Sequence, residues 1–233
     1  MVTLSTTRTR PKPFTWSYSK LKNYETCPKR YFNIDVEKKY KEDDEAGHLG
    51  YGQLVHTSLA DAINHEHKPL PEQVKHLQPW VDKVLGGAKG TILVEQQMAI
   101  TASLTKASSW FGEDVWYRGI GDVVKIAGPV AMVIDWKTGK ILEDGIQLAL
   151  MAQCVFAHHP EVQKIKTRFV WLKEDATTDA LFTREDMVGV WAGLLPRVTT
   201  LKNAHEQMNF PPTPNGLCKR FCIVTGCPHQ GVG

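Results

Sequence analysis

The sequence lacks any apolar run that approaches the roughly 20 residues needed for a membrane-spanning helix. No apolar segment of the kind found in secretion signals follows the basic residues near the N-terminus. Internal repeats are also absent. These absences exclude an integral membrane protein, an exported protein and a repeat array. We therefore expect a soluble, cytoplasmic protein with no membrane partner.

Acidic residues are missing from the start of the chain, where the first one is Glu25. The net charge of the whole chain is only +3, so this basic N-terminal region is a local feature. Each DNA phosphate that a basic segment neutralises releases counterions, so the segment suits a polyanion such as DNA. The alternatives to DNA binding are a solvated tail and, for the ring of Tyr24, packing in the core. The candidate DNA-binding residues are Arg8, Arg10, Lys20, Lys22 and Tyr24.

Cysteine is scarce, with five residues in 233, and an unexported chain rarely uses cysteines as a disulfide framework. Cys218, Cys222 and Cys227 nevertheless lie within ten residues of a proline-rich tail. A short, irregular segment gains folding free energy when it binds a metal. Thiolates suit either tetrahedral zinc or an iron-sulfur cluster, and the spacing does not separate them.

The apolar pattern alternates between helices and strands, which predicts an α/β fold with a mixed central β-sheet flanked by helices. The clearest stripe includes Leu49, His56 and Ile63 and places His56 on the buried side of a helix. Pro196 is expected to kink or interrupt the last helix. The predicted helices are 17–32, 48–64, 74–85, 145–158 and 183–201, and the predicted strands are 92–101, a hairpin within 115–137, and 168–172.

The hairpin carries the strongest chemical signal. Its two apolar runs flank the turn Ala127-Gly128-Pro129, and a turn centred between Gly128 and Pro129 places Asp122 opposite Asp135. Lys137 shares the face of Asp135, because strand side chains alternate. Carboxylate oxygens are the ligands that Mg²⁺ or Mn²⁺ prefers, and a nearby lysine can stabilise developing phosphate charge. This pattern predicts nuclease chemistry.

Four segments together resemble the RecB-type branch of the PD-(D/E)XK nucleases, including its CRISPR-adaptation exonuclease relatives. They are the N-terminal signature from Ser17 to Phe32, Gly52-Gln-Leu-Val-His56, Gly119-Ile-Gly-Asp122, and Asp135-Trp136-Lys137-Thr-Gly139. The resemblance implies a restriction-endonuclease-like core. It also implies that His56, Asp122, Asp135 and the backbone carbonyl of Trp136 hold Mg²⁺ or Mn²⁺, with Lys137 as the catalytic lysine.

The same resemblance implies further roles. Glu95 and Gln147 match supporting positions, although Met151 stands where the family's helix motif has tyrosine. Cys27 joins the three tail cysteines around a [4Fe-4S] cluster, with zinc as the alternative. The tail spacing of three and four residues between cysteines differs from the usual two and five. The expected parts are a basic N-terminal arm (1–16), a nuclease domain (17–209) and a cysteine-rich tail packing with Cys27 (210–233).

The resulting expectation is a metal-dependent deoxyribonuclease, most simply an exonuclease that acts on single-stranded or frayed DNA ends. The alternatives are a structure-specific or nicking endonuclease of the same fold, and a catalytically weak DNA-binding or recruitment module. Enzymes of this type work in recombination, repair, CRISPR spacer processing and viral DNA metabolism. Partner proteins from those pathways are therefore expected, in the cytoplasm of a bacterium or of a virus-infected host.

Overall fold

The computed structural model describes residues 13–41, 47–65, 68–86, 89–142 and 144–232. Five strands form one sheet in the order β1-β2-β3-β4-β5. β3 and β4 pair in parallel, and the other neighbours are antiparallel. The parallel pair requires a crossover connection, which contains helix α5 (Gly145–His158). The strands are β1 (Thr91–Ile100), β2 (Tyr117–Ala127), β3 (Val130–Lys137), β4 (Lys164–Trp171) and β5 (Ala176–Thr183).

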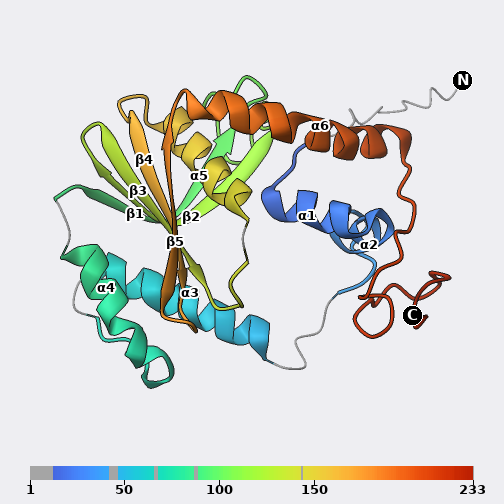
Figure 1. The fold of residues 1–233 in the computed structure, drawn as a ribbon, viewed down its shortest axis with the longest axis horizontal. Helices are drawn as coiled ribbons and strands as arrows, with labels where there is room; N and C mark the ends of the chain where they lie inside the picture. The colour runs from blue at the N-terminus through green and yellow to red at the C-terminus, as the bar shows by residue number, and fades with distance from the viewer. Residues whose placement is uncertain (1–12, 42–46, 66–67, 87–88, 143, 233) are drawn as a thin grey trace, which may run out of the picture.

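Helices cover both faces of this sheet (Figure 1). α3 (His48–Asn64) and α4 (Gln78–Leu85) lie on one side, while α5 and α6 (Asp186–Gln207) lie on the other. α1 (Tyr18–Thr26), α2 (Pro28–Tyr31) and a π-helical turn (Phe32–Val36) lie beside the sheet, with α1 contacting α6. A mixed sheet flanked by helices confirms the predicted fold class. Within the described part of the chain, none of the helices combines the length and apolar character that crossing a membrane requires.

The hairpin of β2 and β3 contributes to both hydrophobic cores, because neighbouring strand residues point to opposite faces. Val124 and Val133 belong to the core under α5 and α6. Val123 and Ile134 belong to the core under α3 and α4. Residues 148–156 of α5 are all buried, which explains why this helix is apolar on nearly every side, with Gln153 as the polar exception. The site described below lies at the end of this doubly packed hairpin.

The N-terminal helix differs from the single helix predicted over 17–32. Ser17 does cap it, since its hydroxyl accepts a hydrogen bond from the Lys20 amide at 3.4 Å. Cys27 then takes an extended conformation (φ −166°, ψ 108°) and separates α1 from α2. The cause is Pro28, because a residue that precedes proline is disfavoured in the helical region. The break turns the chain at Cys27, beside the C-terminal tail.

Several predicted elements are confirmed. The helices 48–64 and 145–158 have the expected bounds, and the side chain of Leu49 lies outside the described residues. The turn is centred between Gly128 and Pro129, since Ala127 pairs with Val130. The helix predicted from 74 to 85 begins earlier, as a 3₁₀ turn (Glu72–Leu77) that leads into α4.

The predicted elements differ most from the structure in the C-terminal half of the chain. β5 was not predicted, because Thr177, Thr178 and Asp179 give this largely exposed edge strand almost no apolar alternation. α6 continues through Pro196 to Gln207, so the predicted interruption and the end at residue 201 are wrong. Leu195 on this helix is 45% exposed, next to the fully buried Leu194. From residue 210 to 232 the described chain has neither helix nor strand, as expected.

Candidate metal centre and nuclease site

Three carboxylates occupy one row across the sheet. The β1–β2 ladder keeps one register on both sides of Glu95, which places Glu95 opposite Asp122. The β2–β3 ladder, continued by one residue, places Asp122 opposite Asp135 as the turn position predicted. The backbone at Glu95 has a φ of 49°, a left-handed conformation that is costly for a non-glycine residue and often marks functional sites.

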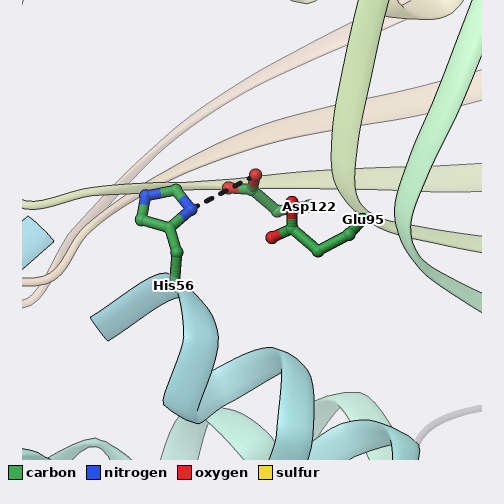
Figure 2. A group of neighbouring side chains, drawn as sticks. All are labelled: His56, Glu95 and Asp122. Atoms are coloured by element: carbon green, nitrogen blue, oxygen red, sulfur yellow. Dashed lines mark ion pairs between the residues drawn. The ribbon is translucent and has the colours of Figure 1, made fainter. Parts of the chain in front are cut away.

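His56 faces this row from α3 (Figure 2), and its side chain is partly buried rather than fully buried as its stripe predicted. Its Nδ1 lies 3.3 Å from Asp122 Oδ1. One ligand atom from each of His56, Glu95 and Asp122 lies within 4.8 Å of the others, and no other group of three does so in the described chain. A cleft of about 550 Å³ opens onto His56 and Glu95, so a ligand can reach the group.

Asp122 is held in place by the neighbouring strand. Its Oδ2 accepts a hydrogen bond from the Trp136 amide at 2.7 Å, which leaves Oδ1 directed at His56. Gly121, just before it, cannot carry a side chain without displacement, because a Cβ there would lie 2.9 Å from Val124. The glycines of the Gly119-Ile-Gly-Asp122 motif therefore serve local packing around the aspartate.

Lys137 and Asp135 form the second half of the site. Lys137 Nζ lies 2.6 Å from Asp135 Oδ2 and donates a hydrogen bond to Gln147 Oε1 at 2.9 Å. Gln147 in turn donates from Nε2 to Asp135 Oδ1 at 3.2 Å. Asp135 Oδ2 is buried against this ammonium group. A carboxylate oxygen has two lone pairs, so one remains for a cation.

The electrostatics of the site show an excess of negative charge. Burial and Asp122 raise the pKa of Asp135 to about 6, against the opposing effect of Lys137. Burial and Asp122 also raise the pKa of Glu95. A hydrogen bond with Asp122 raises the pKa of His56 despite its partial burial. A divalent cation would relieve this crowding, and one imidazole with several carboxylates is a donor set that fits Mg²⁺ or Mn²⁺.

Comparison with known proteins identifies the family. The model of the PD-(D/E)XK nuclease superfamily matches residues 15–232, nearly the whole chain. The chain belongs to this superfamily. No curated protein matches the sequence of this nuclease.

Two solved structures resemble the nuclease in fold. A candidate exonuclease from Eubacterium rectale has a TM-score of 0.51 at 13% identity, over 95% of this chain and 93% of that one. The crystal structure of SSO0001 gives a TM-score of 0.46 at 14% identity, over 96% of this chain and 90% of that one. At 13% identity, the likeness to the Eubacterium rectale protein concerns the fold alone.

The candidate DNA-binding residues of the nuclease have different surroundings. Lys22 is 46% exposed and forms an ion pair of 3.2 Å with Asp144, the N-cap of α5. Tyr24 packs edge-on against Tyr31, with ring centroids 5.9 Å apart, so its ring belongs to the core margin. Trp16, within the expected arm, is fully buried. Arg8 and Arg10 lie outside the described residues.

The four cysteines expected to act together do meet. The Thr213 amide donates to Cys27 Sγ at 3.5 Å, and the Asn215 amide donates to Cys218 Sγ at 3.4 Å. The Asn215 side chain also donates to the Thr26 carbonyl at 2.9 Å, which ties the tail to the end of α1. All are free thiols that line one pocket: Cys27, Cys218, Cys222 and Cys227.

Two further residues near the site, Arg118 and Trp110, were not predicted from the sequence. Arg118 and Trp110 line a pocket of about 410 Å³ together with Lys20, and Gln147 lines the same pocket. Arg118 stands directly before the Gly119-Ile-Gly-Asp122 motif, so its position next to the nuclease site was a usable signal. Trp110 lies in an irregular loop and gave no such signal.

Proposed function

We propose that this nuclease is a metal-dependent exonuclease that hydrolyses phosphodiester bonds at single-stranded or frayed DNA ends. The observation that carries the proposal is the convergence of His56, three carboxylates and Lys137 at the end of one hairpin. The name of the Eubacterium rectale protein, a candidate exonuclease of the same fold, gives additional support. The four motifs that resemble the RecB-type branch support the subfamily.

Each residue at the proposed site has a distinct task. His56, Asp122, Asp135 and the Trp136 carbonyl would hold Mg²⁺ or Mn²⁺, with Glu95 beside them. When bound, the ion supplies a Lewis acid that polarises the phosphate and activates water. Hydrolysis then adds water across one P–O bond of the backbone.

Lys137 acts on the phosphate, and Gln147 positions Lys137. The ammonium group of Lys137 stabilises the negative charge that develops on phosphate oxygens. Gln147 orients that ammonium group, because it bonds both Lys137 and Asp135. Little base specificity is expected, since the reacting group is the sequence-independent backbone.

The test compares linear duplex, closed circular and single-stranded DNA with Mg²⁺, with Mn²⁺ and with chelator. We expect metal-dependent degradation of linear and single-stranded DNA and loss of activity in Lys137→Ala. Lys164→Ala is the matched control, because it removes the same charge from an exposed position on β4. Cleavage without metal, or full activity of Lys137→Ala, would refute the mechanism.

The alternative functions give distinct results in the same assay. Closed circles cut as fast as linear DNA would indicate an endonuclease of the same fold. DNA binding without any cleavage would indicate a binding or recruitment module. Association with recombination, repair or CRISPR proteins is a further expectation, tested by copurification from the native host.

We further propose that the four cysteines bind a [4Fe-4S] cluster that fastens the tail to the nuclease domain. Four free thiols around one pocket, two of them accepting backbone N–H groups, fit a thiolate centre. Four thiolates suit either an iron-sulfur cluster or tetrahedral zinc. The resemblance to the RecB-type branch, some members of which bind a four-iron cluster through such cysteines, favours the cluster. Iron and zinc analysis of anaerobically purified protein distinguishes the two.

For the expected parts, a basic arm (1–16), a nuclease domain (17–209) and a tail (210–233), we propose the same order with an earlier start of the nuclease domain. Trp16 already packs in the core, so the packed part of the chain begins at least one residue before Ser17. Limited proteolysis tests the division, because cleavage should concentrate before Phe14 and spare the tail while the thiolate centre is intact.

A further inference from the structure

A second pocket lies beside the proposed catalytic residues, on the side of the sheet that faces α1 and α5. Gln147 belongs to both places, since it lines the pocket and also bonds Lys137 and Asp135. The pocket of about 410 Å³ falls within the roughly 300–1,000 Å³ typical of small-ligand sites. A ligand in this pocket would therefore touch the catalytic group through one side chain.

Two cations, Lys20 and Arg118, line this pocket. Lys20 and Arg118 are both half-buried, and in the described chain neither has a carboxylate within ion-pair distance. Burial and the charge of Arg118 lower the pKa of Lys20, and the opposing effect of Asp35 offsets this only in part. Partly desolvated like charges are unfavourable unless an anion joins them. The pocket is thus electrostatically incomplete.

Aromatic side chains extend the pocket toward solvent. The Arg118 guanidinium lies 5.6 Å from the Trp110 ring centre and 5.4 Å from that of Phe111, and it donates a hydrogen bond to the Trp110 carbonyl at 2.7 Å. Phe111 is 82% exposed, so its ring is accessible to a ligand that lies next to Arg118. Cations that follow a backbone next to aromatic rings are the combination that binds unpaired nucleotides.

We propose that this pocket binds a nucleotide of single-stranded DNA next to the scissile bond, with Lys20 and Arg118 on its phosphate and Phe111 against a base. The inference rests on the proposed nuclease function and narrows its substrate to unpaired strands, because a base can reach Phe111 only when it is free to leave the helical stack. The phosphate that the two cations bind belongs either to a strand terminus or to the chain interior.

The test measures binding of an internally labelled oligonucleotide by fluorescence anisotropy, with Ca²⁺ in place of Mg²⁺ to suppress hydrolysis. We expect Lys20→Gln and Arg118→Gln each to raise Kd about tenfold, as for loss of a charge-assisted phosphate contact. Each should also reduce the salt dependence of log Kd by about 0.7, the single-strand value for one contact. Lys164→Gln, the matched charge control on β4, should change neither quantity by a comparable amount.

A second pair of variants isolates the ring. Phe111→Ala should weaken single-strand binding by roughly fivefold or more, the lower range for loss of one base stack. Val188→Ala removes a side chain that is 76% exposed on α6 and should leave binding unchanged. Mn²⁺ binding by calorimetry confirms that each variant retains its fold. Oligonucleotides with and without a 5′-phosphate, or a 3′-phosphate, separate terminal from internal recognition.

The outcomes separate this pocket from the general proposal. If the wild-type protein binds and degrades single strands while the Lys20, Arg118 and Phe111 variants behave like their controls, the pocket assignment is overturned and the nuclease function stands. Equal binding of blunt duplex and single strands would also overturn it. If the wild type neither binds nor cleaves DNA, both proposals fail.

Discussion

The two candidate metal-binding regions of this nuclease are built in opposite ways. The carboxylate and imidazole groups of the catalytic region project from β1, β2, β3 and α3, elements that two hydrophobic cores already hold. The cysteines of the other region project from a helix break and a tail without regular structure. The first region needs the core for its geometry, whereas the second needs its ligand to hold the tail. Loss of metal should therefore abolish activity in one case and stability in the other.

The sharpest test of this contrast is Asp122→Asn. The change keeps the shape and a hydrogen-bond acceptor for Trp136 but removes the central carboxylate charge. We expect a fall in activity of at least about 10³-fold, since the Lewis-acid contribution of the ion is worth several kcal/mol. Mn²⁺ binding by calorimetry should be lost as well.

The stability of Asp122→Asn sharpens the comparison further. Asp122 raises the pKa of both Asp135 and Glu95, so its negative charge is repelled in the metal-free protein. Without metal, the thermal midpoint should stay the same or rise, and the iron content at the cysteines should not change. A large loss of stability would mean that the carboxylate row is structural.

The second test acts on the tail. Cys27→Ser should lower stability by about 3 kcal/mol, a typical large effect of losing a bound metal centre, and the thermal midpoint by roughly 6–12 °C for a chain of this size. Iron should be lost, while Mn²⁺ binding at the catalytic region persists. Cys154→Ala is the matched control, because it removes a fully buried thiol from α5, away from the cluster. Equal iron content in both variants would contradict the shared centre.

The contrast between the regions also explains what the sequence could predict. The position of Asp122 opposite Asp135 could be predicted from one turn, Gly128-Pro129, because the register of a hairpin is set locally. The place of His56 followed from helical periodicity. Glu95 and Gln147 reach the site only through strand pairing and helix packing, so sequence spacing alone could not place them. Likewise, β5 forms because β4 offers it an edge, not because its own residues alternate.

Gln147→Leu tests how far the catalytic region depends on its second layer of contacts. The change removes both hydrogen bonds that hold Lys137 and Asp135 together. We expect kcat to fall by about 10- to 100-fold, as is usual for residues that orient catalytic groups, with nearly unchanged Mn²⁺ affinity. The pH profile of kcat should also shift, because the Asp135 carboxylate loses the hydrogen bond that Gln147 donates to it. Gln163→Leu, at an exposed position before β4, should leave kcat and the pH profile unaltered.

Asp179→Asn gives the smallest expected effect and shows what an ordinary ion pair contributes here. Asp179 receives two hydrogen bonds from Arg168, at 2.6 and 2.7 Å, and an ion pair from Lys166. These cations, Arg168 first, lower its pKa to about 2. Because the group is largely solvent-exposed, its loss should cost no more than about 1 kcal/mol at pH 7 and leave activity unchanged.

The pH dependence of this variant tests the charge effect directly. Because the pKa of Asp179 is lower in the folded protein, its charge stabilises the fold above the unfolded pKa of 3.8, and this contribution disappears as the pH falls toward 2. Urea titrations of the variant and the wild type should therefore differ at pH 7 and converge near pH 2. A difference that persists at pH 2 would mean that the side chain stabilises β4 and β5 through packing rather than charge.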